Sequence, residues 1–221
     1  MTEEERLLIP VRPGSAVTAL RCTPESGASD LVFIYAPGAG SNLFDPFGAF
    51  IAAELAKEGI ECWRFQFPYM EARRRAPDRT PFLEATWAAM IGSASETTGR
   101  RVVVGGRSMG GRIASQVVAQ GTQVSGLVLF AYPLHPPGKT ASVRDEHFAQ
   151  IQVPALFCSG TRDSFATAAE LTVAARLVPR ATVRLLDGAD HGFGVLKSSG
   201  RTRQDVWAEA AVALLSFLSS L

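Results

Sequence analysis

The chain has 221 residues, with 22 Lys and Arg against 21 Asp and Glu, so its formal net charge is only +1. A surface that binds duplex nucleic acid needs a clustered cationic excess, and the one dense basic run is Arg73-Arg74-Arg75. We therefore predict no nucleic-acid partner and interpret that run as a solvated loop rather than a docking site. With 47 % hydrophobic and 19 % charged residues, the chain is expected to fold as one domain over residues 1–221.

The beginning of the chain, Met1 to Arg6, is acidic, and the apolar stretch after it is interrupted by Pro10 and Pro13. It lacks the basic start and the apolar run of a secretory signal, and no apolar stretch reaches the roughly 18 residues of a spanning helix. The three cysteines lie far apart in apolar sequence, which is typical of small buried side chains in a reducing compartment. We predict a cytoplasmic protein with no membrane partner, and no local motif favours zinc or nucleotide chemistry.

From about residue 31 onward, short apolar runs alternate with longer amphipathic ones, which is the rhythm of a β/α fold. Most of the runs are near-continuous Val, Ile, Leu and Phe, as in strands that helices cover on both faces. The segment Leu7 to Arg21, broken by prolines, is expected to add one or two antiparallel strands at the sheet edge. The other predicted strands are Leu31–Ala36, Ile60–Phe67, Arg101–Gly105, Val124–Phe130, Val153–Ser159 and Thr182–Leu186.

Helix start and stop signals lie between these strands. Asp45 is predicted as an N-cap with Pro46 at the first helical position, and Gly59 as the left-handed stop. The interval between the strands ending at Phe130 and beginning at Val153 is too short for a lid domain. The sequence thus predicts a doubly wound, mostly parallel sheet with helices on both faces and no lid. The other predicted helices follow Thr80-Pro81, run from Met109 to Gln120 and from about Ala166 to Leu177, and begin at Thr202.

The segment Gly106-Arg107-Ser108-Met109-Gly110 matches Gly-x-Ser-x-Gly where a predicted strand turns into a helix. A serine at the apex of such a turn has strained backbone angles, and glycines two residues before and after it avoid collisions. Ser108 Oγ then projects above the sheet, and the Met109 amide points to the place where negative charge develops. The alternative is a tight glycine turn with an incidental serine.

A serine hydroxyl is a poor nucleophile unless a base takes its proton, and the chain has three histidines. His135 and His191 both follow predicted strands, whereas His147 lies in the short insertion. His191 is favoured because only it also comes after a plausible acid in chain order. An exposed loop histidine without a partner is the alternative.

That acid is Asp163, which follows an apolar strand and a glycine turn and would orient the imidazole through its Nδ1–H. It could instead cap the following helix. Asp187 and Asp190 are competing acids, but folding either onto the nearby His191 would demand a tight local turn. The second oxyanion donor is expected in the loop Pro37-Gly38-Ala39-Gly40, with the Ala39 amide preferred to that of Gly40. This loop lacks the third glycine of a dinucleotide-binding motif.

Together these segments resemble the α/β-hydrolase family over roughly residues 30 to 221. Within it, the chain is similar to small lid-less members related to dienelactone hydrolases and to the hydrolase-like domain of the NSL histone-acetyltransferase complex regulatory subunit. The resemblance implies an eight-stranded sheet, a Ser108, Asp163 and His191 triad, an oxyanion hole made by Ala39 and Met109, no metal and no cofactor. The segments are Pro37-Gly38-Ala39-Gly40, Gly106 to Gly111, Gly160-Thr161-Arg162-Asp163 and Asp190-His191-Gly192-Phe193.

Two departures from the family pattern matter. Pro37 stands where many members have His, and the elbow carries Ser108 rather than the Cys of true dienelactone hydrolases, which argues against that exact reaction. The expected activity is hydrolysis of small carboxylic esters through an acyl-enzyme, with a small-molecule acyl substrate as the partner. A thioesterase, peptidase or perhydrolase, or a non-catalytic interaction module on the same fold, stays open, as does the oligomeric state.

Several further side chains fall in loops at the predicted carboxyl edge of the sheet. Arg107 and Arg112, near the elbow, could meet an anionic group of the substrate or point to solvent. Six apolar residues could line an acyl pocket or be ordinary core and loop residues: Phe44, Tyr69, Tyr132, Leu134, Phe165 and Phe193.

Overall fold

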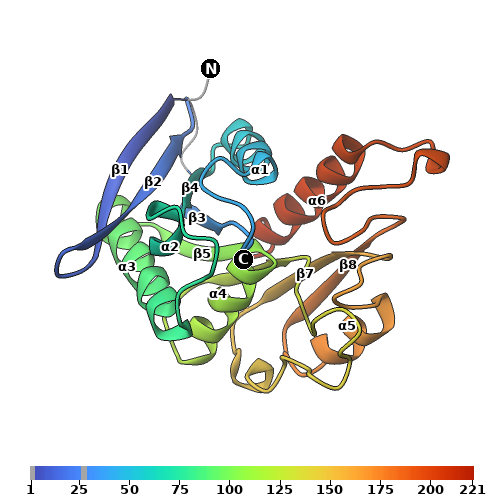
Figure 1. Cartoon of the computed structure of the whole chain (residues 1–221). Helices are drawn as coiled ribbons and strands as arrows, with labels where there is room; N and C mark the ends of the chain where they lie inside the picture. Colours follow the sequence, from blue (N-terminus) through green and yellow to red (C-terminus); the bar gives the residue numbers. More distant parts are fainter. Residues whose placement is uncertain (1–2, 26–28) are drawn as a thin grey trace.

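An eight-stranded sheet crosses the molecule in the order β1-β2-β4-β3-β5-β6-β7-β8 (Figure 1). The computed structural model describes residues 3–25 and 29–221, so Met1 and Thr2 of the acidic beginning lie outside the described residues. The pairs β1–β2 and β2–β4 are antiparallel, and the remaining neighbours are parallel. The predicted fold class, a mostly parallel sheet between helices, is confirmed.

The elements alternate along the chain as the apolar periodicity predicts. The strands are β1 (Glu3–Arg12), β2 (Ser15–Thr23), β3 (Leu31–Ala36), β4 (Glu61–Phe65), β5 (Arg101–Arg107), β6 (Gly126–Phe130), β7 (Ala155–Gly160) and β8 (Ala181–Leu186). The helices are α1 (Pro46–Lys57), α2 (Pro68–Glu71), α3 (Thr80–Thr98), α4 (Met109–Ala119), α5 (Ala168–Ala175) and α6 (Arg203–Leu218), with short 3-10 turns η1 (Phe148–Gln150) and η2 (Lys197–Ser199).

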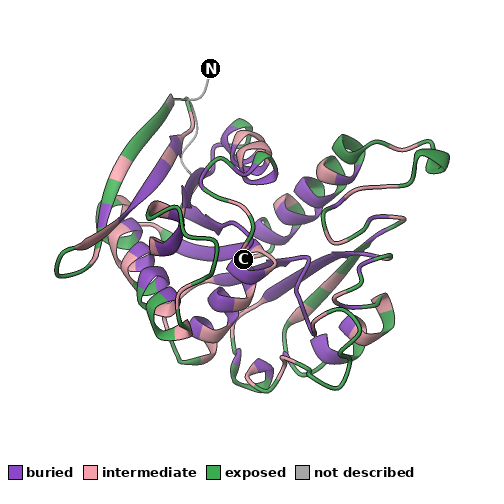
Figure 2. Ribbon diagram, in the orientation of Figure 1, coloured by how far each residue is buried: buried purple, intermediate pink, exposed green. Residues whose placement is uncertain are grey.

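The helices cover the two faces of the sheet in separate groups. On one face, α3, α4 and α5 pack through side chains such as Trp87, Ile113 and Leu171. On the other, α1 and α6 pack through side chains such as Phe47 and Leu214. Figure 2 shows the resulting continuous buried layer along β3, β5, β6 and β7. Burying one such large apolar side chain stabilises the fold by about 1.5–3 kcal/mol, so these two layers fix the positions of the strand ends.

Helix α1 begins and ends at the predicted signals. The Asp45 carboxylate accepts a hydrogen bond from the Gly48 amide at 3.1 Å, and Pro46 occupies the first turn. Gly59 has φ 73° and lets the chain leave the helix in the left-handed conformation. Because these signals are local in sequence, they place the helix directly after the loop that follows β3.

The N-terminal segment forms two antiparallel strands at the sheet edge, as predicted. β1 begins at Glu3, earlier than predicted, and pairs with β2 over nearly its whole length. β2 in turn pairs with β4, with Cys22 opposite Cys62. The register shifts between Pro10 and Arg12, an irregularity that suits an edge strand.

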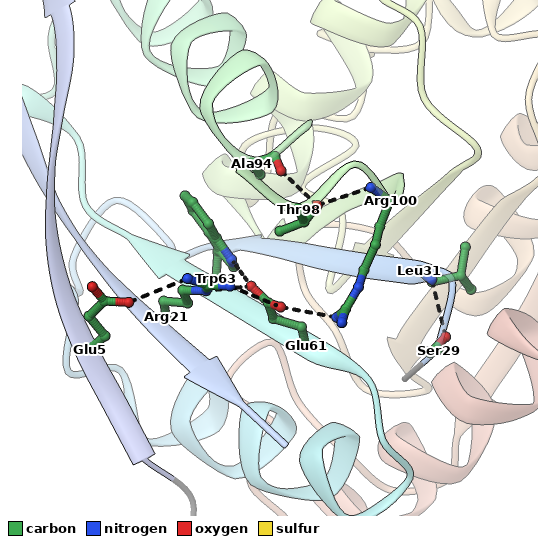
Figure 3. Close-up of polar contacts among 9 residues, drawn as sticks. All are labelled: Glu5, Arg21, Ser29, Leu31, Glu61, Trp63, Ala94, Thr98 and Arg100. Atoms are coloured by element: carbon green, nitrogen blue, oxygen red, sulfur yellow. Dashed lines mark hydrogen bonds and ion pairs between the residues drawn. The ribbon is translucent and has the colours of Figure 1, made fainter. Parts of the chain in front are cut away.

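A buried carboxylate stands at the amino-terminal ends of the parallel strands. Glu61, the first residue of β4, is only 1 % exposed. It accepts hydrogen bonds from Arg21 Nε at 2.7 Å, Trp63 Nε1 at 2.6 Å and Arg100 Nη1 at 3.0 Å (Figure 3). We call Glu61 and these three donors the Glu61 cluster. Its two guanidinium groups compensate the buried charge, so the cluster joins β2, β4 and the beginning of β5.

All three cysteines are buried, as predicted, and no disulfide joins them. Burial raises the pKa of the Cys158 thiol to about 12, which keeps it protonated and unreactive. In the ranges 3–25 and 29–221, none of the helices combines the length and the apolar composition needed to cross a bilayer.

Candidate active site

Ser108 lies at a sharp turn between β5 and α4. Its backbone has φ 53° and ψ −118°, a conformation that costs a residue with a side chain about 1–3 kcal/mol. A Cβ at Gly106 would come within 2.5 Å of the Ala36 carbonyl oxygen, and one at Gly110 within 2.3 Å of the same atom. The predicted need for glycine is real, but its main cause is the neighbouring end of β3 pressed against the turn.

The structure brings Ser108, His191 and Asp163 together. Ser108 Oγ lies 2.9 Å from His191 Nε2, and His191 Nδ1 lies 2.8 Å from Asp163 Oδ2 and 3.0 Å from Oδ1. Ser108 follows β5, Asp163 follows β7 and His191 follows β8, and the carboxyl ends of these parallel strands lie at one edge of the sheet. The His191 side chain is 23 % exposed whereas the Asp163 side chain is fully covered, so a substrate can reach the imidazole but water does not reach the carboxylate.

Asp163 is held from both sides by neutral donors. The Ser159 hydroxyl donates to Oδ2 at 3.2 Å, and the Phe165 amide donates to Oδ1 at 2.8 Å. The loops after β7 and β8 can approach because residue 160 is glycine: a Cβ there would lie 2.1 Å from the Ala189 carbonyl oxygen. The N-cap of α5 is Thr167, so Asp163 does not serve as the cap of that helix.

The two competing acids shape the histidine loop from outside the imidazole. Asp190 Oδ1 accepts hydrogen bonds from the Gly192 and Gly194 amides, at 2.9 and 2.8 Å. Asp187 Oδ1 accepts one from Thr161 Oγ1 at 3.3 Å. These contacts hold the turn that carries His191, and neither carboxylate is the hydrogen-bond partner of the imidazole, which is Asp163.

The two other histidines have their ring nitrogens engaged elsewhere. His135 is buried, with Nδ1 3.0 Å from the Pro136 carbonyl oxygen and Nε2 3.3 Å from Glu170. The Pro136 carbonyl raises the pKa of His135. His147 Nε2 lies 2.8 Å from the Ser115 hydroxyl, and burial lowers the pKa of this imidazole.

Two of the six candidate pocket side chains contact the site. The Phe165 ring stacks on the His191 imidazole, with centroids 4.0 Å apart and planes at 27°. The Tyr69 hydroxyl donates to the Ala39 carbonyl oxygen at 2.8 Å, and burial raises the pKa of Tyr69 to about 12. The others divide between surface and core: Phe44 is 71 % exposed, whereas Tyr132, Leu134 and Phe193 are buried.

The loop after β3 lies directly against the serine. A Cβ at Gly38 would be 3.5 Å from Ser108 Cβ, and the Ser41 amide donates to the Gly38 carbonyl oxygen at 3.0 Å, which closes a turn over Ala39 and Gly40. This is the position from which the Ala39 amide could serve an oxyanion, with the Met109 amide at the first turn of α4.

Asp45 supports this loop, a role that the sequence did not reveal. Its buried carboxylate accepts hydrogen bonds from the Tyr35 hydroxyl at 2.5 Å and from Ser41 Oγ at 3.2 Å. Arg107 Nη1, from the elbow, lies 3.8 Å away, so Arg107 does not point freely into solvent. Burial, with the Asp45 charge, raises the pKa of Tyr35. The helix cap thus ties the loop after β3, the expected oxyanion loop, to the elbow.

Arg112 is half-buried on α4 rather than in solvent, and its Nη1 is 3.4 Å from Gln116 Oε1. In the described part of the chain, no group of three His, Cys, Asp or Glu side chains is placed to hold a metal ion.

Many solved structures are similar to this chain over nearly its whole length, and three of them illustrate the likeness. An α/β serine hydrolase homologue from Coxiella burnetii has 18 % identity and a TM-score of 0.77, covering 98 % of this chain and 97 % of its own. A dienelactone hydrolase from Anabaena variabilis has 16 % identity and a TM-score of 0.75, covering 97 % and 98 %. A serine hydrolase without lid from Xanthomonas campestris has 16 % identity and a TM-score of 0.75, covering 97 % and 95 %.

These identities are low, so the structural matches speak for the fold alone. The sequence comparison is more specific, since a family model described as an alpha/beta hydrolase domain matches residues 29–219. That match includes the strand ends on which Ser108, Asp163 and His191 lie. The chain therefore belongs to the α/β-hydrolase family.

Proposed function

We propose that the protein is a serine hydrolase that cleaves small carboxylic esters through an acyl-enzyme on Ser108. The observation that carries the proposal is the unbroken hydrogen-bonded chain from Ser108 Oγ through His191 to the buried Asp163 carboxylate. Membership of the family agrees with a hydrolase activity.

Each residue has a defined part in the proposed reaction. His191 Nε2 takes the Ser108 proton as the oxygen attacks the ester carbonyl carbon, and the carbonyl oxygen becomes an oxyanion held by the Ala39 and Met109 amides. His191 then returns the proton to the leaving alcohol. In the second half, His191 removes a proton from water as the water oxygen attacks the acyl-enzyme, and it gives that proton to Ser108 Oγ as the bond to the acyl group breaks and the acid leaves. Asp163 keeps the imidazole tautomer and stabilises the imidazolium.

The rate enhancement expected from each of these groups is the general value for its kind of catalysis. General-base assistance contributes about 10² to 10⁴ in rate. One oxyanion donor contributes about 10² to 10³. The strained turn at Ser108 supports the assignment, since backbone strain that persists in a folded protein is concentrated at functional positions.

A small ester is favoured by the way the segment between β6 and β7 folds. Its side chains Tyr132, Leu134, Phe148 and Ile151 are buried, so this segment belongs to the core and offers little apolar surface to a long acyl chain. The half-exposed Phe165 ring beside His191 provides one apolar wall, which suits a short substrate.

The test is covalent labelling with a fluorophosphonate, together with turnover of short-chain p-nitrophenyl esters. We expect stoichiometric labelling of the wild type, and loss of both labelling and turnover in Ser108→Ala at an unchanged melting temperature. Ser115→Ala is the matched control, because Ser115 also contacts a histidine but is fully buried. Folded wild-type protein that stays unlabelled would favour the non-catalytic binding module instead.

The remaining alternative is a different acyl transfer with the same residues. Thioesterase, peptidase and perhydrolase reactions would share the nucleophile and the base, so labelling does not separate them. A panel of matched ester, thioester and peptide substrates does. We expect the highest kcat/KM for esters, and a higher value for thioesters or peptides would replace the proposed substrate class.

A further inference from the structure

A surface pocket of about 390 Å³ adjoins the oxyanion loop. The loop after β3 lines one part of it, and α2 with the following basic run lines the rest. The lining consists of residues 39–42, Tyr69, Met70 and residues 73–75. Three of these side chains are guanidinium groups and none is a carboxylate, so the pocket is strongly cationic in a chain whose net charge is only +1.

The backbone presents the three arginines as an ordered turn. The Arg73 amide donates to the Met70 carbonyl oxygen at 3.0 Å, and the Arg74 amide donates to that of Tyr69 at 2.8 Å. Arg73 itself has φ 53°, in the left-handed region. The interpretation of this run as a solvated loop is therefore incomplete: the side chains are exposed, but they line a pocket together with residues 39–42 of the loop after β3.

Most of the positive charge in this pocket is uncompensated. Arg74 pairs with Asp78 at 2.5 Å. Within the described ranges, the Arg73 and Arg75 side chains have neither a hydrogen bond nor an ion pair. Like charges that line one pocket repel one another, and an anion bound by both guanidinium groups would relieve the repulsion. The forked donors of Arg match a carboxylate or a phosphate group in geometry as well as in charge.

A hydrogen bond connects the pocket to the loop beside Ser108. Tyr69 lines it and donates from its hydroxyl to the Ala39 carbonyl oxygen at 2.8 Å, while Ala39 and Gly40 form the wall that the pocket shares with the oxyanion loop. A ligand that contacts the arginines would thus lie against Ala39, whose amide is the proposed oxyanion donor.

Strand order indicates which part of a substrate reaches this pocket. The loops after β3 and β4 lie on one side of β5, and β7 and β8, which carry Asp163 and His191, lie on the other. His191 must return its proton to the leaving alcohol, so the alcohol lies towards β7 and β8. The acyl chain is then free to extend the opposite way, over Gly40 and towards the arginines.

We propose that the preferred acyl groups end in an oxyanion, a carboxylate or a phosphate-type group, which Arg73 and Arg75 bind. This inference rests on the proposed esterase function and specifies its substrate class. In the reaction the distal anion stays unchanged, and only the ester bond to Ser108 forms and breaks.

The experiment compares p-nitrophenyl hydrogen adipate with methyl p-nitrophenyl adipate, which differ in one charge at nearly equal length. Hydrogen glutarate and hydrogen suberate esters vary the reach, and the matching ω-phosphonate ester distinguishes the two kinds of anion. The variants are Arg73→Asn, chosen because asparagine tolerates the left-handed conformation, Arg75→Gln and the two combined. Arg180→Gln is the matched control, since Arg180 is exposed at the opposite end of the sheet, just before β8.

At low ionic strength we expect the wild type to favour the charged ester by roughly tenfold in kcat/KM at the best chain length. The double variant should lose this preference while its turnover of the methyl ester stays unchanged, and added salt should erode the preference in the wild type. Equal turnover of charged and neutral esters at every length, or equal loss on both esters in the double variant, would overturn the inference alone. No turnover of any ester would overturn the proposed function as well.

Discussion

Two buried carboxylates at opposite ends of the sheet have different partners. Glu61, at the amino-terminal end, faces two guanidinium groups and an indole N–H. Asp163, at the carboxyl end, faces a hydroxyl, an amide and an imidazole. An arginine keeps its charge under all ordinary conditions, so the charge of Glu61 is always compensated. The charge of Asp163 is compensated fully only when His191 is protonated, which is the state that the proposed proton transfer from Ser108 would create.

The comparison teaches how to tell a structural carboxylate from a reactive one. Burial alone does not separate them, since Glu61 is 1 % and Asp163 is 3 % exposed. The nature of the partner does. Permanently charged partners make a buried carboxylate a stabilising cross-link. A partner that can gain a proton lets the carboxylate stabilise a positive charge that would form only during the proposed reaction.

The largest expected effect separates the two carboxylates by activity. Asp163→Asn should lower kcat for ester hydrolysis by about 10⁴, because the amide favours the wrong imidazole tautomer. Asp187→Asn, which alters a carboxylate near the histidine loop, should stay close to wild type. Steady-state kinetics on both variants make the measurement, and an Asp163→Asn enzyme retaining a tenth of the activity would contradict the assignment.

Replacing the carboxylate at the other end of the sheet, that of Glu61, by an amide should act on stability. Glu61→Gln leaves the partly exposed guanidinium groups of Arg21 and Arg100 without the Glu61 charge, so we expect a loss of about 1–3 kcal/mol in the free energy of unfolding. The kcat of the folded fraction should not change. Urea denaturation and kinetics below the transition make the comparison, and a lowered kcat at wild-type stability would reverse the roles given to the two regions.

Asp45 extends the comparison, because its carboxylate both stabilises the fold and supports the loop beside Ser108. Asp45→Ala should cost about 1 kcal/mol for the helix cap and about 1–3 kcal/mol more for the unpaired Tyr35 hydroxyl. It should also lower kcat by roughly tenfold through the oxyanion loop, a fraction of what removing a donor itself costs.

Thr202→Ala provides the control for this variant. It removes the cap of α6 and should lower stability by about 1 kcal/mol with kcat unchanged. Thermal unfolding and kinetics on both variants give the answer. Equal kcat in Asp45→Ala and wild type would reduce Asp45 to a helix cap.

The smallest expected effect concerns His135, whose Pro136 and Glu170 contacts raise its pKa in the folded state. The stabilisation is therefore complete below the unfolded value of about 6.5 and is lost as pH rises through the folded pKa. His135→Gln should remove this dependence, worth up to about 1 kcal/mol. Melting temperatures of both proteins at acidic and alkaline pH test it, and a constant difference across that range would count against it.

Local signals made much of the molecule predictable. The N-cap Asp45, the stop Gly59 and the Gly-x-Ser-x-Gly turn act within a few residues of themselves, and the strands of the parallel sheet were predicted to within two residues at their ends. Element ends fray by about that amount in any assignment. The fold class and the family resemblance are confirmed, whereas the catalytic roles of Ser108, Asp163 and His191 stay predictions until the reaction is measured.

What could not be predicted depends on contacts between distant segments. β1 begins in the charged run at Glu3 because β2 supplies its hydrogen-bond partners, not because its residues favour a strand. The Glu61 cluster joins residues 40 positions apart, and nothing near Glu61 in the sequence indicates it. Asp45 was identified as a cap, but its contacts with Tyr35 and Ser41 exist only once the loop has folded over α1.

The positive φ at Ser108 lowers the thermal stability of the protein but places a hydroxyl at the turn. Glycine would occupy that turn without the conformational penalty that serine meets there, so a population of variants screened for thermal tolerance alone would drift towards glycine at this position. Only a demand for the hydroxyl would hold serine in place. If Ser108 is the nucleophile, as proposed, the elbow is a point where thermal stability has been given up for reactivity.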